Sequence, residues 1–136
     1  MHDLIELKQI IDSEFSYANL SEEKIINKLN SENTRIFKKT ISEKITGFIE
    51  IELKEGIGTI NGIAVKKEYR RKGIGKELFE YALKFMKKNQ IGLVKLLVKE
   101  NNNTAKELYK KYDFLFSGIH PRKIENTIIE VWEKII

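Results

Sequence analysis

The residues best suited to chemistry in this sequence are Arg70-Arg71-Lys72-Gly73-Ile74-Gly75. They lie between an apolar run over residues 57–65, typical of a buried strand, and an amphipathic run over residues 76–88, typical of a helix. Where a glycine-bearing turn leads into a helix, several backbone N–H groups lack partners, and the helix dipole adds partial positive charge. Such a turn is suited to phosphate, and two arginines and a lysine add full charges. The sequence therefore predicts a phosphate-binding loop.

Two common phosphate loops do not fit this stretch. A Walker loop would need glycine at Arg70 and Ser or Thr at Glu77, and a dinucleotide fingerprint would need glycine at Leu78. The pattern Arg/Gln-x-x-Gly-x-Gly/Ala is filled without a gap by Arg70, Gly73 and Gly75. In this the stretch resembles the acetyl-CoA pyrophosphate loop of the GCN5-related N-acetyltransferases (the GNAT family). The alternative is a plain strand-to-helix turn with solvated charges.

The elements that would position this loop predict a mixed α/β fold. Residues 4–30 have helical periodicity, and further helices are expected over 76–88 and 104–112. Strands are expected over residues 34–39 (a weak one), 46–53, 57–65, 93–98, 114–117 and 127–132. A short turn at residues 54–56 predicts a hairpin, and the helix 76–88 predicts a parallel crossover. We expect one domain over residues 1–136, with a central, mostly antiparallel sheet, a parallel βαβ unit and flanking helices.

Two details of the central strands carry predictions of their own. Phe48, Glu50 and Glu52 alternate with apolar residues, which predicts a half-buried strand. Gly58 and Gly62 in the next strand predict a bulge or a close approach of something to the backbone.

Composition excludes several kinds of site. The 136-residue chain has no cysteine, which excludes disulfides and a cysteine nucleophile and fits a reducing cytoplasm. Its two histidines, His2 and His120, make a histidine metal site improbable, so no metal is expected. No apolar run approaches the roughly 20 residues of a membrane span, and the first residues do not have the build of a secretory signal. The net charge of +5 is dispersed among glutamates, which is typical of a solvated surface rather than a nucleic-acid-binding face.

The resemblance to the GNAT family extends over residues 57–116. The family's strand before the loop often ends in Ile-Ala-Val, and Ile63-Ala64-Val65 stand here. A second family block, Val-x-x-x-Asn-x-x-Ala-x-x-Leu-Tyr-x-Lys-x-Gly-Phe, is matched by Val98, Asn102, Ala105, Leu108, Tyr109, Lys111 and Phe114. The resemblance implies a GNAT-like fold and acetyl-CoA as cosubstrate.

It also implies roles for individual residues. The backbone N–H groups from Arg71 to Lys76 would hold the pyrophosphate. The backbone of Ile63 and Val65 would pair with the pantetheine arm. An N–H near Val65 would stabilise the oxyanion, and Asn102 and Ala105 would contact the cofactor. Tyr109 would protonate the departing thiolate. The alternatives are a buried strand end for residues 63–65, a helix cap for Asn102 and a core position for Tyr109.

The sequence departs from the family at the general base. Relatives often carry a glutamate where Thr59 or Leu97 stands here. Glu50, Glu52, Glu130 and His120 are other candidates, each more simply a solvated residue, and a water chain could serve instead. The family's opening strand is absent or very short, and Asp113 replaces a glycine at the end of the second block.

The sequence thus predicts an N-acetyltransferase that uses direct transfer in a ternary complex, because no cysteine can carry an acyl intermediate. The acceptor would be a primary amine: a protein or peptide N-terminus, a lysine or a small amine. One alternative is a non-catalytic acyl-CoA-binding or regulatory domain of the same fold, and another is a basic nucleic-acid-binding module. A cytoplasmic location without membrane contact is expected, and a homodimer is left open.

Overall fold

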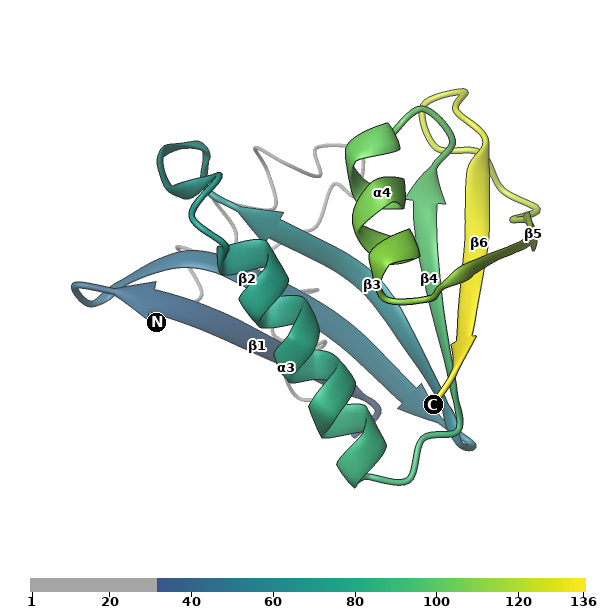
Figure 1. Ribbon diagram of the computed structural model, residues 1–136, viewed down its shortest axis with the longest axis horizontal. Coiled ribbons are helices and arrows are strands. Elements are labelled where there is room, and N and C mark those ends of the chain that lie inside the picture. The colour runs from purple at the N-terminus through teal and green to yellow at the C-terminus, as the bar shows by residue number, and fades with distance from the viewer. Residues whose placement is uncertain (1–31) are drawn as a thin grey trace.

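The computed structural model of the chain describes residues 32–136 (Figure 1). The helices expected within residues 4–30, and with them the question of an opening strand, lie outside the described residues. In chain order the described elements are β1 (Thr34–Ile41), β2 (Lys44–Lys54), β3 (Ile57–Val65), the short 3-10 helix η2 (Lys67–Tyr69), α3 (Ile74–Lys88), β4 (Leu93–Lys99), α4 (Asn103–Lys111), β5 (Leu115–Ile119) and β6 (Ile129–Ile135).

The strands form a six-stranded sheet in the order β1-β2-β3-β4-β6-β5. Only β3 and β4 are parallel, and α3 makes the crossover between them; the other pairs are antiparallel. In Figure 1, α3 and α4 lie on the same face of the sheet. The mixed, mostly antiparallel sheet with one parallel βαβ unit is confirmed.

Several boundaries differ from the predicted ones because strand pairing, not local pattern, decides them. The strand expected to be weak, β1, has eight residues because it pairs along β2. The last strand, β6, begins and ends later than expected, because its register with β4 runs from Ile129 to Ile135. The strand β5, expected over residues 114–117, begins at Leu115 and ends at Ile119, and Phe114 before it belongs to the core.

The core lies between α3 and the sheet. Its fully buried members include Ile49 and Ile51 of β2, Phe79 and Met86 of α3, and Leu96 of β4. The prediction that β2 is half-buried was wrong, because residues 45–51 are buried on both faces. The alternation of residue types correctly predicted that successive side chains point to opposite faces of β2. It did not predict that both faces are buried.

The prediction of a bulge or a close backbone approach at Gly58 and Gly62 is confirmed, with a close approach at the first glycine and a bulge at the second. A methyl group at Gly58 would collide with the sulfur of Met86, so α3 packs directly on the strand backbone there. At Gly62 the register with β2 shifts: Glu50 faces Gly62 while Ile51 faces Ile60, which leaves Asn61 as the extra residue of a β-bulge. The bulge bends β3 at the point where its pairing with β4 stops.

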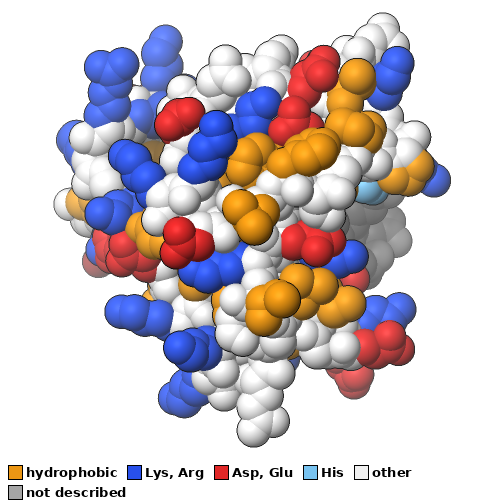
Figure 2. Space-filling view, turned by 45° about the vertical axis from the view of Figure 1, so that its right-hand side comes forward, with side chains coloured by type: hydrophobic (Ala, Val, Ile, Leu, Met, Phe, Trp, Pro, Cys, Tyr) orange, Lys and Arg blue, Asp and Glu red, His pale blue; other side chains and the backbone are white. Residues whose placement is uncertain are grey.

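Figure 2 shows a surface on which Lys and Arg side chains are interleaved with Asp and Glu, with apolar patches between them. Four exposed apolar side chains belong to β5 and the end of β6: Leu115, Phe116, Ile119 and Ile135. Within residues 32–136, neither the length nor the apolar character of any helix suffices to cross a membrane.

Candidate active site

A cleft opens where β3 and β4 separate. The two strands pair only over Ile57–Ile60 and Leu93–Leu96, and Figure 1 shows them diverging beyond that point. The cleft has a volume of about 230 Å³. It is lined by Ile60, Asn61, Gly62 and Ile63 of β3, Leu97, Val98 and Lys99 of β4, and Asn102, Ala105 and Tyr109 at α4. A ligand in it would touch both strands and one helix.

Two backbone N–H groups near the end of β3 point to the side on which the strand has no partner. The N–H of Lys66 donates to Thr46 O on β2 at 2.8 Å. Since successive residues of a strand direct their N–H groups to opposite sides, the N–H groups of Val65 and Ile63 point away from β2, toward the side of β4. Pairing with β4 has already ended there, so these groups can meet an extended ligand.

The predicted phosphate loop lies at the end of β3 and leads into α3. Gly73 is the N-cap of α3 with φ of 80°, a conformation that favours glycine, and no side chain caps the helix. Arg71 also has positive φ, at 64°. Among the described residues, the structure records no acceptor for the N–H groups of residues 71–76. Open N–H groups at a helix N-terminus are an anion site.

The three basic side chains of the loop are exposed, and one of them is tied to β3. Arg70 Nε donates to Val65 O at 3.0 Å, which ties the loop to the end of β3. The side chain of Ile74 is buried in the core. Arg71 and Lys72 are exposed, and Lys72 Nζ lies 5.5 Å from the centre of the Tyr69 ring. Arg70 is exposed as well, so all three predicted cations lie at the surface of the loop.

At α4 the helix start is closed by a side chain. Asn102 Oδ1 accepts from the N–H of Ala105 at 3.1 Å, and Asn102 also lines the cleft. The capping alternative for Asn102 is therefore correct.

Tyr109 is both a core residue and a cleft residue. Its ring packs against Phe79, with 5.5 Å between ring centres, and only 5% of the residue is exposed. Burial raises the pKa of Tyr109 to about 12. The described residues supply no recorded hydrogen-bond partner for its hydroxyl, and they include no fully buried side-chain oxygen that lacks one. The hydroxyl therefore opens to the cleft that the residue lines.

An ion pair anchors α4 to the sheet. Lys106 Nζ lies 3.2 Å from Glu130 Oε2, and Trp132 Nε1 donates to Glu130 Oε1 at 2.9 Å. The two charged side chains are 17% and 14% exposed. This arrangement fixes the helix that carries Asn102 and Tyr109.

Three of the four candidate bases differ from the prediction that each is a solvated residue. Glu130 is ion-paired, and Glu50 is 7% exposed and accepts from Asn61 Nδ2 at 3.0 Å. Glu52 is exposed, as expected, and His120 is half-buried with Nδ1 accepting from Arg122 N at 3.1 Å. Neither Thr59 nor Leu97 can act as a base.

The structure brings four of the predicted site residues into the cleft: Ile63, Asn102, Ala105 and Tyr109. Ala64 faces Phe48 across the sheet, and the loop and Val65 lie beyond the cleft at the end of β3. Sequence reasoning missed Asn61. The glycine signal for a bulge pointed to this position, but it did not say which residue the bulge would expose.

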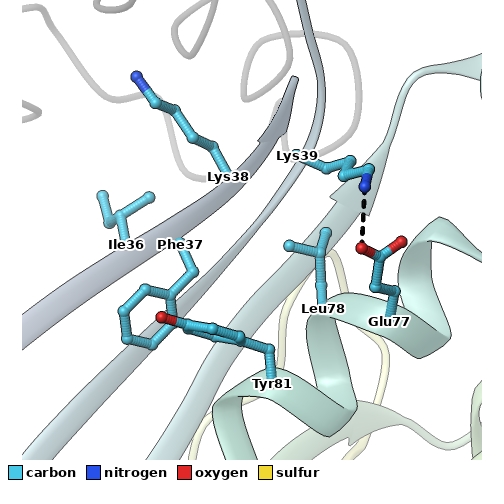
Figure 3. Close-up of a pocket in the computed structure, with 7 residues that line it drawn as sticks. All are labelled: Ile36, Phe37, Lys38, Lys39, Glu77, Leu78 and Tyr81. Atoms are coloured by element: carbon cyan, nitrogen blue, oxygen red, sulfur yellow. Dashed lines mark hydrogen bonds and ion pairs between the residues drawn. The ribbon is translucent and has the colours of Figure 1, made fainter. Parts of the chain in front are cut away.

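A second cavity lies between β1 and α3, on the side of α3 away from the cleft, and has a volume of about 510 Å³ (Figure 3). Phe37 and Tyr81 meet edge to face in it, with 4.9 Å between ring centres. Lys39 Nζ lies 2.8 Å from Glu77 Oε1 across it. This pair matters for the loop, because it offsets the negative charge that Glu77 brings to the first turn of α3.

The sequence profile of the acetyltransferase (GNAT) domain family matches residues 5–131. The chain belongs to this family. Its members are acetyltransferases.

Two curated relatives come from Bacillus subtilis (strain 168). One, provisionally named a ribosomal protein bS18-alanine N-acetyltransferase, is 32% identical over 75 residues, covering 55% of this chain and 50% of the relative. The other, streptothricin acetyltransferase A, is 33% identical over 64 residues, covering 47% and 37%. The matched regions thus span half or less of each relative's length.

Solved structures show the same fold at lower identity. The PaiA N-acetyltransferase from Thermoplasma acidophilum, in complex with coenzyme A, is 23% identical with a TM-score of 0.78, covering 98% of this chain and 93% of that one. NAA60 from Arabidopsis thaliana, in complex with a bisubstrate analogue, is 22% identical with a TM-score of 0.82, covering 98% and 92%.

Proposed function

We propose that this GNAT chain transfers the acetyl group of acetyl-CoA to a primary amine, as one acetyltransferase domain over residues 1–136 in a cytoplasmic setting. The observation that carries the proposal is the combination of an open, uncapped start of α3 with an adjoining cleft between β3 and β4. The open start of α3 suits a pyrophosphate, and the cleft suits an extended thioester arm. The coenzyme A complex of the fold neighbour PaiA supports this ligand.

In the proposed complex, the N–H groups of residues 71–76 bind the pyrophosphate. The N–H groups of Ile63 and Val65, which point away from β2, pair with the arm as an added strand would. The Val65 N–H would lie at the thioester carbonyl and stabilise the oxyanion, a contribution typically of about 3 kcal/mol.

The reaction forms an N–C bond and breaks the C–S bond. One proton leaves the amine nitrogen and one reaches the thiolate, so the products are an amide and coenzyme A thiol. With Glu absent at residues 59 and 97, solvent water at the exposed mouth takes the amine proton. The acetyl group passes directly to the amine, since the sequence has no cysteine that could carry it.

Tyr109 is the proposed donor to the leaving sulfur. Its pKa of about 12 means that the hydroxyl stays protonated throughout the physiological range. Complete transfer to a thiolate of pKa about 8.5 would be uphill by roughly 3.5 units, or about 5 kcal/mol. The favoured role is therefore a hydrogen bond to sulfur as the C–S bond lengthens, with the proton moving only as charge develops.

The acceptor is proposed to be the α-amino group of a peptide or protein. The name of the bS18-alanine relative and the bisubstrate complex of NAA60 support this class. A small amine is the second candidate, supported by the streptothricin relative.

A non-catalytic acyl-CoA-binding domain is the alternative that one observation favours: Leu97, apolar, lines the cleft where relatives often carry the base. Release of free thiol from acetyl-CoA distinguishes the two functions. We expect turnover with a peptide that begins with alanine or with a simple alkylamine, without added metal. Saturable acetyl-CoA binding without thiol release across both acceptors would favour the alternative. Equal affinity for acetyl-CoA, ATP and NAD by calorimetry would contradict both.

A further inference from the structure

A buried carboxylate lies beside the β3 bulge. Glu50 and Thr46 are the two buried polar residues of the part of the chain that the structure describes. Ile49 and Ile51 on either side of Glu50 are fully buried in the core beneath α3. Since side chains alternate along a strand, Glu50 projects from the opposite face of the sheet.

The bulge brings a cleft residue to this carboxylate. Asn61 is the unpaired residue of the bulge, and Gly62, the residue directly opposite Glu50, has no side chain. Asn61 Nδ2 donates to Glu50 Oε2 at 3.0 Å, and Asn61 is itself exposed and lines the cleft. A single side chain therefore joins the buried Glu50 to the open cleft.

This hydrogen bond fixes the orientation of the amide. A carboxylate can only accept, so the Asn61 group that faces it must be the NH₂ group. The Asn61 carbonyl oxygen is then the end available to a ligand. The other groups proposed to act in the cleft, the N–H groups of Ile63 and Val65 and the hydroxyl of Tyr109, are donors. An amine that attacks a thioester needs the opposite, an acceptor for its N–H.

We propose that Asn61 and Glu50 form the acceptor-amine subsite of the cleft. Asn61 Oδ1 accepts an N–H of the attacking primary amine. Glu50 is the positioning residue: it holds the amide in the orientation that presents Oδ1 to the amine. This inference rests on the proposed function and adds to it the group that recognises the acceptor.

Three variants and one control test the subsite. Glu50→Gln keeps the shape of the side chain but can either donate or accept, so the Asn61 amide is no longer held in one orientation. Asn61→Ala removes the contact with the acceptor, and the double variant removes both. Glu52→Gln is the control, because Glu52 is two residues along the same face of β2 and is exposed. The probe acceptors are a peptide that begins with alanine and n-butylamine.

For the acceptor that wild type acetylates, we expect Asn61→Ala and Glu50→Gln each to lower kcat/KM for the amine at least about tenfold, the effect of one charge-assisted hydrogen bond. The dissociation constant of acetyl-CoA should change less than about twofold, and Glu52→Gln should match wild type. The double variant should be no worse than Asn61→Ala, because Glu50 acts through Asn61. Calorimetry and thiol release supply both readouts.

The outcomes separate the inference from the function. Unchanged amine kinetics in Asn61→Ala would overturn the subsite and leave the acetyltransferase proposal standing. Fully multiplicative losses in the double variant would also overturn it, since they would mean that Glu50 acts independently of Asn61. A wild-type chain that binds acetyl-CoA but acetylates neither probe would contradict the proposed function and this inference together.

Discussion

The two helices beside the cleft begin in opposite ways. At α3 the N-cap is Gly73, no side chain closes the first turn, and the N–H groups of residues 71–76 have no recorded acceptor among the described residues. At α4 the N-cap is Asn102, whose side chain accepts from Ala105 N. Helix dipoles alone would make both ends anion sites. Capping therefore decides which helix N-terminus can bind an anion. The start of α3 presents backbone N–H groups to a ligand, whereas α4 presents side chains.

Substituting Gly75 should cause the largest loss of acetyl-CoA binding at the start of α3. A Cβ at Gly75 would lie 3.8 Å from Val65 Cγ2, which is ordinary contact, so Gly75→Val should fold. Its side chain would occupy the space where phosphate approaches the N–H groups. We expect calorimetry to show at least about a 30-fold loss of acetyl-CoA affinity, comparable with about 2 kcal/mol.

The control for this variant is Gly118→Val on the edge strand β5, where nothing lies within 4 Å of an added Cβ. It should keep wild-type affinity. Gly73 is less useful, because its positive φ would strain any other residue. A well-folded Gly75→Val with wild-type affinity would remove the phosphate site from α3.

Tyr109→Phe should affect α4 in the complementary way, with a loss of rate and little loss of binding. The ring stays in its packing against Phe79 and Phe114. We expect kcat to fall at least about tenfold in steady-state kinetics with acetyl-CoA, because the lost hydroxyl acts mainly in the transition state. The loss should shrink with thioesters of more acidic thiols, which need less help in leaving.

The pH dependence of kcat tests the same role of the Tyr109 hydroxyl. Burial raises the pKa of Tyr109 to about 12, so the hydroxyl remains protonated as pH rises through 10. If Tyr109 lost its proton between pH 7 and 10, kcat would fall in wild type but not in Tyr109→Phe. We therefore expect no such difference between the two proteins. Such a difference would contradict the buried, protonated donor. Tyr112→Phe, whose lost hydroxyl donates to Glu80 instead of facing the cleft, is the matched control.

Glu130→Gln should loosen the attachment of α4. Glutamine can still accept from Trp132, but Lys106 loses its half-buried counter-ion. We expect thermal or urea unfolding to show a loss of about 1 kcal/mol, and kcat to fall a few-fold while acetyl-CoA affinity is kept. The exposed pair of Lys110 and Glu107 provides the control, since Glu107→Gln should change neither. Equal effects of the two variants would mean that the anchor is unimportant.

The smallest effect is expected at Lys39, which pairs with Glu77 in the first turn of α3 (Figure 3). Lys39→Met leaves the negative charge of Glu77 unpaired beside the anion site. Because both side chains are substantially exposed, the expected loss of acetyl-CoA affinity is only about two- to threefold. It should disappear in high salt. Lys88→Met, at the far end of α3, should have no effect.

The same contrast explains how much could be predicted from sequence. The loop and α3 are local: glycine spacing and helical periodicity predicted residues 70–76 and the helix that follows. The parallel β3–β4 pair followed from its crossover helix. The Glu50–Asn61 contact could not be predicted, because it depends on a bulge that joins residues of two strands in a register that only pairing sets. The anchoring of Glu130 to Lys106 depends likewise on a contact between residues 24 apart.

We expect acetyl-CoA to bind at the open start of α3 and along β3, and not at the capped start of α4. Titrating the ¹⁵N-labelled chain with coenzyme A and following backbone amide resonances tests it directly. We predict saturable shifts that are largest for residues 71–76, together with Ile63 and Val65, and smaller ones for the first turn of α4, where Ala105 N–H is already bonded to Asn102. Shifts that centre on residues 103–105 and leave residues 71–76 unmoved would contradict the account.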